Sequence, residues 1–244
     1  MNIKRTTYIL IITNILTGIA LLVVSFHYDL PQKILHRIGI SSSIAQDSNY
    51  KYTDNPKFEV RRSLFGVYNP IHTKIVMLGD SITYQAEWNE LLERNDVANR
   101  GIGSDITEGF LSRLSDIYKL NPEMCFIMGG INDIGKGIPT KMIFENYIKL
   151  IKALEDKNIK PVIQSTLYVS TKRHDWKEMN IGVDELNALL KEYAQANDLS
   201  FIDVNSELSM NDSLNPSYTY DGVHLLGNGY AKWKKLIIKE LREK

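Results

Sequence analysis

From residue 71 onward, short apolar runs alternate with longer stretches in which apolar residues recur at helical spacing. Apolar runs of about four to eight residues are typical of buried strands, and a period of about 3.6 residues is typical of amphipathic helices. The sequence predicts five strands, at residues 74–78, 97–99, 124–128, 161–165 and 199–204. It predicts helices at residues 87–94, 107–118, 139–157, 183–197 and 229–241.

This order of elements predicts an α/β fold. Apolar strands that alternate with helices form a parallel sheet with helices on both faces, which gives a three-layer α/β/α sandwich of about five strands. Ligands of such sheets bind at the carboxyl ends of the strands. Residues that directly follow a predicted strand are therefore the first candidates for a functional site.

The segment 8–26 differs from the rest of the chain because it carries no charge over 19 residues. As a helix it would be about 28 Å long, close to the roughly 30 Å hydrocarbon core of a bilayer. Lys4 and Arg5 precede it, which favours an N-terminus in the cytoplasm. The sequence therefore predicts a single-pass transmembrane anchor, with the following chain outside the cytoplasm in the periplasm or the extracellular space.

Two other interpretations of this segment remain. A cleaved secretory signal shares the basic start, but the apolar stretch is long for one and residues 27–31 contain no small-residue cleavage site. A helix buried in the domain core is the second alternative, and the nearly uniform apolar character of the segment disfavours it.

The chain divides into three predicted parts. Residues 1–26 form a cytoplasmic stub and the anchor, and residues 71–244 form one globular domain with a full core. Residues 27–70 are polar and rich in turn residues, so we expect a spacer, with a short helix at 32–38 and a packed arm at 58–68.

Composition narrows the function classes. Lys+Arg and Asp+Glu both number 29, so the formal net charge is zero, which argues against a strongly basic nucleic-acid binder and leaves only a local basic patch as an alternative. Cys125 is the only cysteine, which rules out an intrachain disulfide and a multi-cysteine metal site.

Two of the strand-end loops carry groups suited to nucleophilic catalysis. Ser81 follows the first predicted strand at the start of a helix, where free N–H groups and the helix dipole favour a developing negative charge. His224, just before the last helix, suits a general base because its unperturbed pKa is near neutrality. Asp221 can orient its imidazole and stabilise the protonated form. The alternatives are a helix-capping role at Ser81 and an ordinary surface histidine at 224.

Two further loops carry hydrogen-bond donors. Gly101 and Gly103 allow close backbone approach after the second strand, and the N–H groups of Gly103 and Ser104 can point into a site. The spacing lacks the third glycine of a dinucleotide-binding fingerprint. Asn132 follows the third strand and offers an uncharged N–H donor suited to an oxyanion, with a plain turn residue as the alternative.

Together these residues resemble the SGNH/GDSL hydrolase family of esterases and acylhydrolases. Residues 79–81 (GDS) resemble its nucleophile block, 99–114 its glycine block, 130–133 (GIND) its G-x-N-D block and 221–224 (DGVH) its D-x-x-H block. The four blocks occur in order, and the resemblance spans residues 71–241. It implies a flavodoxin-like fold.

The resemblance also implies roles for the site residues and a reaction that needs no metal or cofactor. Ser81 would be the nucleophile, His224 the base and Asp221 its partner. The oxyanion donors would be the N–H of Ser81, an N–H of the glycine block and the Asn132 side chain. The family often has glycine where this chain has Ser104, and we assign the glycine-block donor to Ser104, with Gly103 as the alternative.

The expected function is that of a membrane-anchored serine esterase. Its substrates would be small-molecule or glycan esters, with O-acetyl or short acyl groups on envelope glycans favoured by the predicted location. An O-acetyltransferase, a lysophospholipase-like lipid esterase and a non-catalytic binding module that keeps the fold are the alternatives. His174 with Asp175 is a competing base pair, and the sequence leaves the oligomeric state open.

Overall fold

The computed structural model describes residues 49–68 and 72–242. The predicted anchor at 8–26 and the predicted short helix at 32–38 lie outside the described residues. Within the described ranges, no helix combines the length and the apolar character needed to cross a bilayer.

The centre of the fold is a five-stranded parallel sheet with the strand order β2-β1-β3-β4-β5. All five predicted strands are present, with ends that shift by no more than two residues. Their bounds are β1 Ile75–Gly79, β2 Val97–Gly101, β3 Met124–Met128, β4 Lys160–Gln164 and β5 Ser200–Ile202.

Alternate residues of each strand enter two separate apolar cores. Ile75 and Met77 of β1 pack in one core, whereas Val76 and Leu78 pack in the other. The residues of β3 divide between the same two cores in the same way. Burial of both faces explains why these strands read as continuous apolar runs in the sequence.

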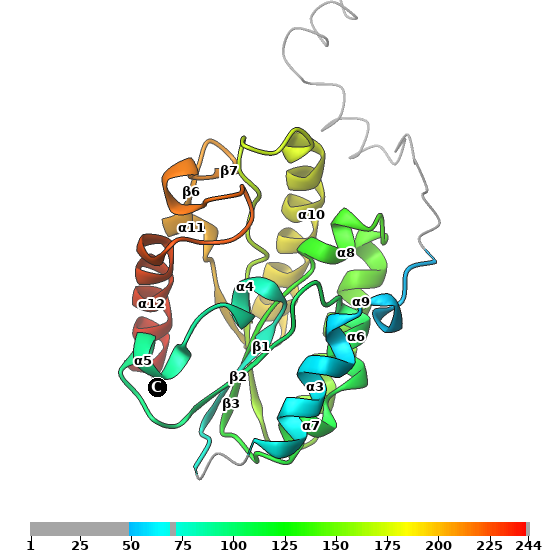
Figure 1. Cartoon of the computed structure of the whole chain (residues 1–244), viewed down its shortest axis with the longest axis vertical. Helices are drawn as coiled ribbons and strands as arrows, with labels where there is room; N and C mark the ends of the chain where they lie inside the picture. Colours follow the sequence, from blue (N-terminus) through cyan, green and yellow to red (C-terminus); the bar gives the residue numbers. More distant parts are fainter. Residues whose placement is uncertain (1–48, 69–71, 243–244) are drawn as a thin grey trace, which may run out of the picture. The chain divides into compact units, whose positions relative to one another are not determined.

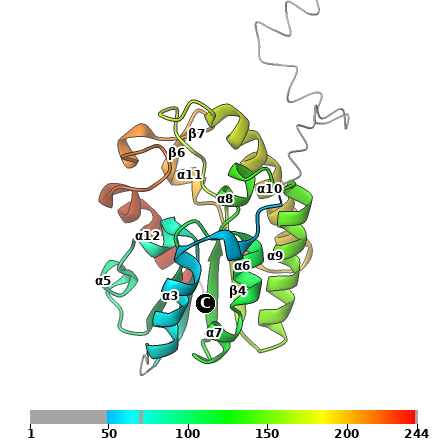
Figure 2. The same cartoon turned by 45° about the vertical axis from the view of Figure 1, so that its right-hand side comes forward.

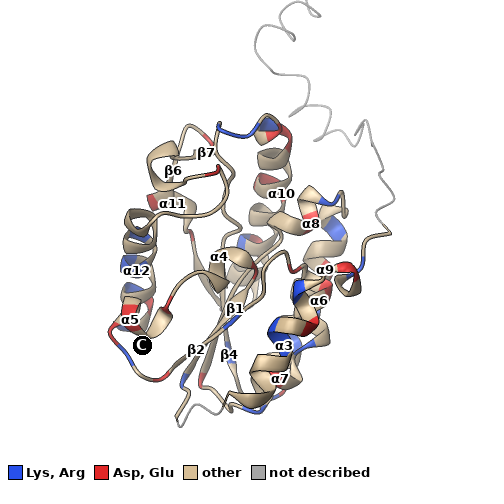
Figure 3. Cartoon of the chain, viewed as in Figure 1, with Lys and Arg blue, Asp and Glu red and all other residues tan. Residues whose placement is uncertain are grey.

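Helices cover the two faces of the sheet as the predicted three-layer arrangement requires (Figures 1 and 2). One face is covered by α5 (Trp88–Leu92) and α12 (Gly227–Arg242), where the Trp88 and Trp233 rings meet edge to face with centroids 4.9 Å apart. The other face is covered by α6 (Thr107–Ser112), α7 (Ser115–Tyr118), α9 (Thr140–Glu155) and much of α10 (Trp176–Ala196). Charges of both signs are mixed along the outer helices (Figure 3).

Two predicted helices have the wrong extent. The predicted helix at 107–118 is two short helices, because the chain leaves the helical path at Arg113 and turns that side chain into the interior, where it is fully buried. The predicted helix at 183–197 is α10, which begins seven residues earlier at Trp176 because Met179 and Asn180 are also buried.

Several short elements were not predicted. They are too short to show a helical or strand period in the sequence. They comprise α4 (Ser81–Tyr84), α8 (Ile131–Gly135), α11 (Asn205–Leu208), the hairpin of β6 (Ser209–Met210) and β7 (Ser213–Leu214), and the 3₁₀ turns η1 (Tyr52–Asp54) and η2 (Pro216–Tyr218).

The segment before the sheet forms η1 and α3 (Lys57–Val67), which we call the arm. Phe58 and Phe65 of α3 are buried against Ile102, which follows β2. Arg62 pairs with the nearly buried Asp116 at 3.0 Å. The arm is therefore held on the loop that follows β2.

Replacing Phe58 tests this packing. Phe58 is 1% exposed, so Phe58→Ala should lower the free energy of unfolding by about 3 kcal/mol through lost burial and the cavity left behind. Val60 lies on the same helix but is 68% exposed, and Val60→Ala should change the free energy by less than about 0.5 kcal/mol. Urea unfolding of both variants measures the difference, and equal effects would contradict the packing.

Candidate active site

Ser81 lies at the point where β1 passes into α4. Asp80 caps this helix, and its Oδ1 accepts the Ile82 N–H at 2.9 Å. The turn is too tight for a side chain at Gly79, because a Cβ there would lie 2.0 Å from Thr83 Oγ1. The short helix consequently holds Ser81 at the carboxyl edge of the sheet.

Long-range hydrogen bonds fix α4 in place. The Asn99 amide of β2 donates to three carbonyls at the end of the helix, at 2.9–3.1 Å, those of Thr83, Tyr84 and Ala86. From the other side, Tyr230 of α12 donates its hydroxyl to the Ile82 carbonyl at 2.6 Å. A helix of one turn has little stability of its own, so these contacts determine its orientation.

The structure brings Ser81, His224 and Asp221 together in one hydrogen-bonded chain. His224 Nε2 lies 2.9 Å from Ser81 Oγ, and His224 Nδ1 lies 2.6 Å from Asp221 Oδ2. An ionised carboxylate only accepts hydrogen bonds, so Nδ1 carries the hydrogen and Nε2 is free to accept from the serine hydroxyl. The competing base pair predicted from the sequence was His174 with Asp175. The Asp175 carboxylate, just before α10, accepts two hydrogen bonds from the Arg173 side chain, at 2.8 and 2.5 Å.

Hydrogen bonds favour the ionised form of Asp221. Partial burial opposes ionisation, but the His224 ring and the backbone N–H groups of Val223 and His224 all bond to this carboxylate. The bonds outweigh the burial and hold the pKa of Asp221 below its ordinary value. Asp221 is therefore a carboxylate at neutral pH.

The loop that carries His224 is held by the loop after β4. The Ser170 N–H donates to the Gly222 carbonyl at 2.7 Å, and Lys172 Nζ donates to the Thr219 carbonyl at 2.6 Å. Gly222 has a φ of +94°, a conformation that glycine adopts without strain. Beside the imidazole, the exposed Tyr220 ring lies nearly parallel to it at a centroid distance of 5.9 Å.

The other two predicted donors lie on neighbouring loops. Ser104 follows β2 in a loop joined to the end of β1 by a bond from the Ile102 N–H to the Gly79 carbonyl at 3.1 Å. Asn132 lies in the first turn of α8, and its Nδ2 donates to the Asp105 carbonyl at 2.9 Å. The loops of Ser81, Ser104 and Asn132 are thus connected to one another.

A buried ion pair lies beneath these loops. Arg113 and Asp105 are both 0% exposed and pair at 2.9 Å. Arg113 also donates to the carbonyls of Arg100 at 2.7 Å and Gly79 at 3.0 Å, which are the penultimate residue of β2 and the last residue of β1. Sequence reasoning missed this role, although a charged residue among the apolar positions of a predicted helix was a signal for it.

A second buried carboxylate holds the Asn132 loop. Asp133 accepts the Thr107 N–H at 3.0 Å and the Thr107 hydroxyl at 2.6 Å. Asn146 of α9 donates to the same hydroxyl at 3.0 Å. Thr107, which the sequence did not single out, therefore ties the start of α6 to α8.

Burial raises the pKa of three neighbouring carboxyl groups. The pKa rises to about 7 for Asp80 and to about 6 for Asp105 and Asp133. Desolvation is the largest cause in each case, and the Asp105 and Asp133 charges raise the Asp80 value further. No described residue bonds to Asp80 Oδ2, which is buried.

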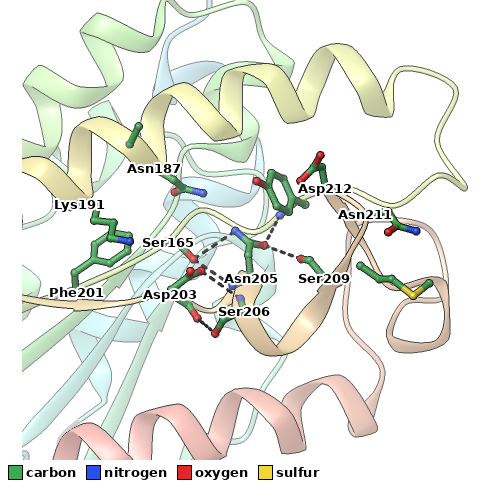
Figure 4. Close-up of a pocket in the computed structure, with 13 residues that line it drawn as sticks. Ser165, Asn187, Lys191, Phe201, Asp203, Asn205, Ser206, Ser209, Asn211 and Asp212 are labelled. Carbon is green, nitrogen blue, oxygen red and sulfur yellow. Dashed lines mark hydrogen bonds between the residues drawn. The ribbon is translucent and has the colours of Figure 1, made fainter. Parts of the chain in front are cut away.

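A separate cavity of about 410 Å³ lies between α10, the end of β5 and the β6–β7 hairpin (Figure 4). Its lining is mostly polar, with Asn187 and Lys191 from α10 facing Asp203 and the hairpin. None of the predicted site residues lines it, so it is distinct from the site around Ser81.

Comparison with known proteins establishes the family. Residues 77–232 match the GDSL-like lipase/acylhydrolase family, and the chain belongs to this family. Membership places it among the ester-hydrolysing enzymes. The matched residues include all of the loops described above.

Individual proteins resemble this chain in sequence or in fold. An N-acylneuraminate cytidylyltransferase of Streptococcus agalactiae is 28% identical over 161 residues, which are 65% of this chain and 36% of that protein, so the chain matches only about a third of that relative's length. A GDSL-like lipase from Bacteroides thetaiotaomicron has a TM-score of 0.67 at 24% identity, covering 76% of this chain and 97% of that chain. An acetylxylan esterase from Geobacillus stearothermophilus has a TM-score of 0.59 at 18% identity, covering 71% and 96%.

The raised pKa of Asp80 predicts a pH-dependent stability. Above about pH 4 the unfolded chain loses this proton, whereas the folded protein keeps it until about pH 7. Ionisation of Asp80 therefore favours the unfolded state. The free energy of unfolding should fall over this pH window by about 1.4 kcal/mol for each unit by which the pKa of Asp80 is higher in the folded protein than in the unfolded chain. Asp80→Asn keeps an acceptor for the Ile82 N–H but removes the titration.

Urea unfolding at intervals from pH 4.5 to 8 checks this prediction. The free energy of unfolding should fall with pH in the wild type but not in Asp80→Asn, so the difference, Asp80→Asn minus wild type, should rise with pH. Parallel curves would contradict a protonated Asp80 in the folded protein.

Proposed function

We propose that this protein is a membrane-anchored serine esterase that removes O-acetyl or short acyl groups from glycans outside the cytoplasm. The hydrogen-bonded chain from Asp221 through His224 to Ser81 is the observation that carries the proposal. It supplies a nucleophile, a base and an orienting acid in one line.

The geometry accounts for each proton in the reaction. Ser81 Oγ attacks the ester carbonyl carbon while His224 Nε2 takes the hydroxyl proton, and Asp221 stabilises the imidazolium that forms. The tetrahedral intermediate collapses as His224 returns that proton to the leaving alcohol. Water then attacks the acyl-enzyme with His224 again as base, which releases the acid and restores Ser81.

Three donors are assigned to the developing oxyanion. They are the N–H groups of Ser81 and Ser104 and the side-chain amide of Asn132. The Asn132 Nδ2 carries two hydrogens, of which one is bound to the Asp105 carbonyl and the other remains for the oxyanion. Loss of one such donor costs about 10²- to 10³-fold in kcat in well-studied hydrolases.

Two observations support a glycan ester as the substrate. The Tyr220 ring, which lies beside His224 and directly precedes Asp221 in the sequence, is 56% exposed and offers an apolar body with a polar tip to a sugar ring. The names of the similar proteins point in the same direction, since one acts on acetylxylan and another is an N-acylneuraminate cytidylyltransferase.

The location rests on the sequence alone. The uncharged segment 8–26 and the preceding Lys4 and Arg5 support an anchor with the catalytic domain outside the cytoplasm. Such a domain would reach glycans of the cell envelope.

Substitution of the proposed nucleophile and base tests the mechanism. Ser81→Ala and His224→Ala should each lower kcat for p-nitrophenyl acetate by at least about 10³-fold, because no neighbouring group replaces them. His174→Ala is the matched control and should leave kcat within about twofold of the wild type. Fluorophosphonate labelling of Ser81→Ala at the wild-type level would remove Ser81 from the nucleophile role.

The topology is tested separately in intact cells. The segment 8–26 should retain the protein in the membrane fraction, and protease added to intact cells or spheroplasts should digest the catalytic domain. A cytoplasmic protein serves as the control for cell integrity. Digestion only after lysis would contradict the proposed location.

A further inference from the structure

Asn55 links the arm to the loop of the proposed oxyanion donor. It lies between η1 and α3 and is 3% exposed. Its Nδ2 donates to the Gly103 carbonyl at 2.9 Å, and its Oδ1 accepts the Lys57 N–H at 3.1 Å. Asn55 lies outside residues 77–232, which match the family.

The Gly103 carbonyl and the Ser104 N–H belong to the same peptide group. A trans peptide is planar, so its C=O and N–H point in opposite directions. A hydrogen bond that fixes the direction of the carbonyl therefore fixes the direction of the N–H. The same bond also polarises the peptide and strengthens the N–H as a donor.

This peptide is the central one of a tight turn. The Asp105 N–H bonds to the Ile102 carbonyl at 3.2 Å, which places Gly103 and Ser104 at the two central positions. Ser104 has a φ of +61°, as the third residue of a type II turn requires. A type I turn closes with the same hydrogen bond, but its central peptide is rotated by about 180° and its third residue has a negative φ.

A serine at position 104 favours a type I turn over the type II turn that the structure has. Side chains other than glycine prefer negative φ, so Ser104 alone would favour the type I form, in which its N–H points the other way. Such a strained conformation persists only where surrounding contacts enforce it. The Asn55 bond supplies that contact, and the Lys57 side chain packs over Gly103 beside it, with Cδ 3.1 Å from the position of a Cβ there.

We infer that Asn55 is a positioning residue of the oxyanion hole, which holds the Gly103–Ser104 peptide in the orientation that directs the Ser104 N–H at the substrate. This inference rests on the proposed function, because it takes Ser104 as an oxyanion donor. The arm is then part of the active-site machinery as well as part of the fold.

Asn55→Asp is the sharpest test. Aspartate keeps an acceptor for the Lys57 N–H, but it cannot donate to the Gly103 carbonyl when ionised and repels that oxygen. The peptide should then rotate, and kcat for p-nitrophenyl acetate should fall roughly 10- to 100-fold with KM within about twofold, because the donor acts on the transition state.

The double variant Asn55→Asp/Ser104→Gly distinguishes positioning from packing. Glycine adopts positive φ without strain, so the type II form should be regained in part and kcat should recover at least about threefold over Asn55→Asp. A residue that only packed the arm or contacted the substrate would give no such recovery.

Asn187→Asp is the matched control. Asn187 donates to the Thr166 carbonyl at 2.9 Å and accepts the Thr166 N–H at 2.7 Å, so the substitution removes a similar bond at the cavity of Figure 4. Its kcat should remain within about twofold of the wild type. All assays are run where circular dichroism shows each variant folded.

The outcomes separate the inference from the proposed function. Four results would overturn the inference: a wild-type kcat in Asn55→Asp, an effect of this substitution on KM alone, a fall in kcat that follows the unfolded fraction, or no recovery of kcat in the double variant. In each of these cases an inactive Ser81→Ala variant would still support the proposed function. Full activity in Ser81→Ala would overturn the proposed function itself.

Discussion

The buried ion pair between Arg113 and Asp105 is the contact on which the rest of the site depends. One guanidinium bonds to carbonyls within the last two residues of two adjacent strands and to the carboxylate that follows the glycine loop. Removal of one partner from a buried pair costs about 3–5 kcal/mol, because the other charge is left uncompensated. The fold therefore cannot lose this contact without also releasing the loops around Ser81.

The two sides of the site are held by different means. The loops of Ser81, Ser104 and Asn132 are fixed from below by buried groups, so the proposed oxyanion donors are held in place before any substrate arrives. The histidine side is more open, since Asp221 is 38% and His224 23% exposed, and it is held mainly by backbone bonds to the loop after β4. The proposed donors thus lie on rigid loops, whereas the proposed base is more accessible to solvent.

The sequence predicted the five strands because strands buried on both faces leave apolar runs that stand out in the chain. It also singled out Ser81, Asn132 and His224, whose residue types are chemically distinctive and which follow the β1 and β3 strands or precede the last helix. It could not place Arg113, because the helical period assigned it to a continuous helix that the buried ion pair interrupts.

The contact of Asn55 with Gly103 was beyond sequence reasoning for another reason. Such a contact joins segments 48 residues apart, and Asn55 itself lay in a stretch expected to be a spacer. Local composition carries no information about which distant backbone group a side chain will bond to. We infer that the turn type at Ser104 depends on such a bond, the one between Asn55 and the Gly103 carbonyl.

The distance along the chain between Ser81 and His224 has a consequence for biosynthesis. The two residues are 143 positions apart, and α4 is also fastened by Tyr230 near the C-terminus. A ribosome must release the chain through His224 before these two side chains can form their hydrogen bond. A chain that ends before His224 therefore cannot form the proposed Ser81–His224 pair.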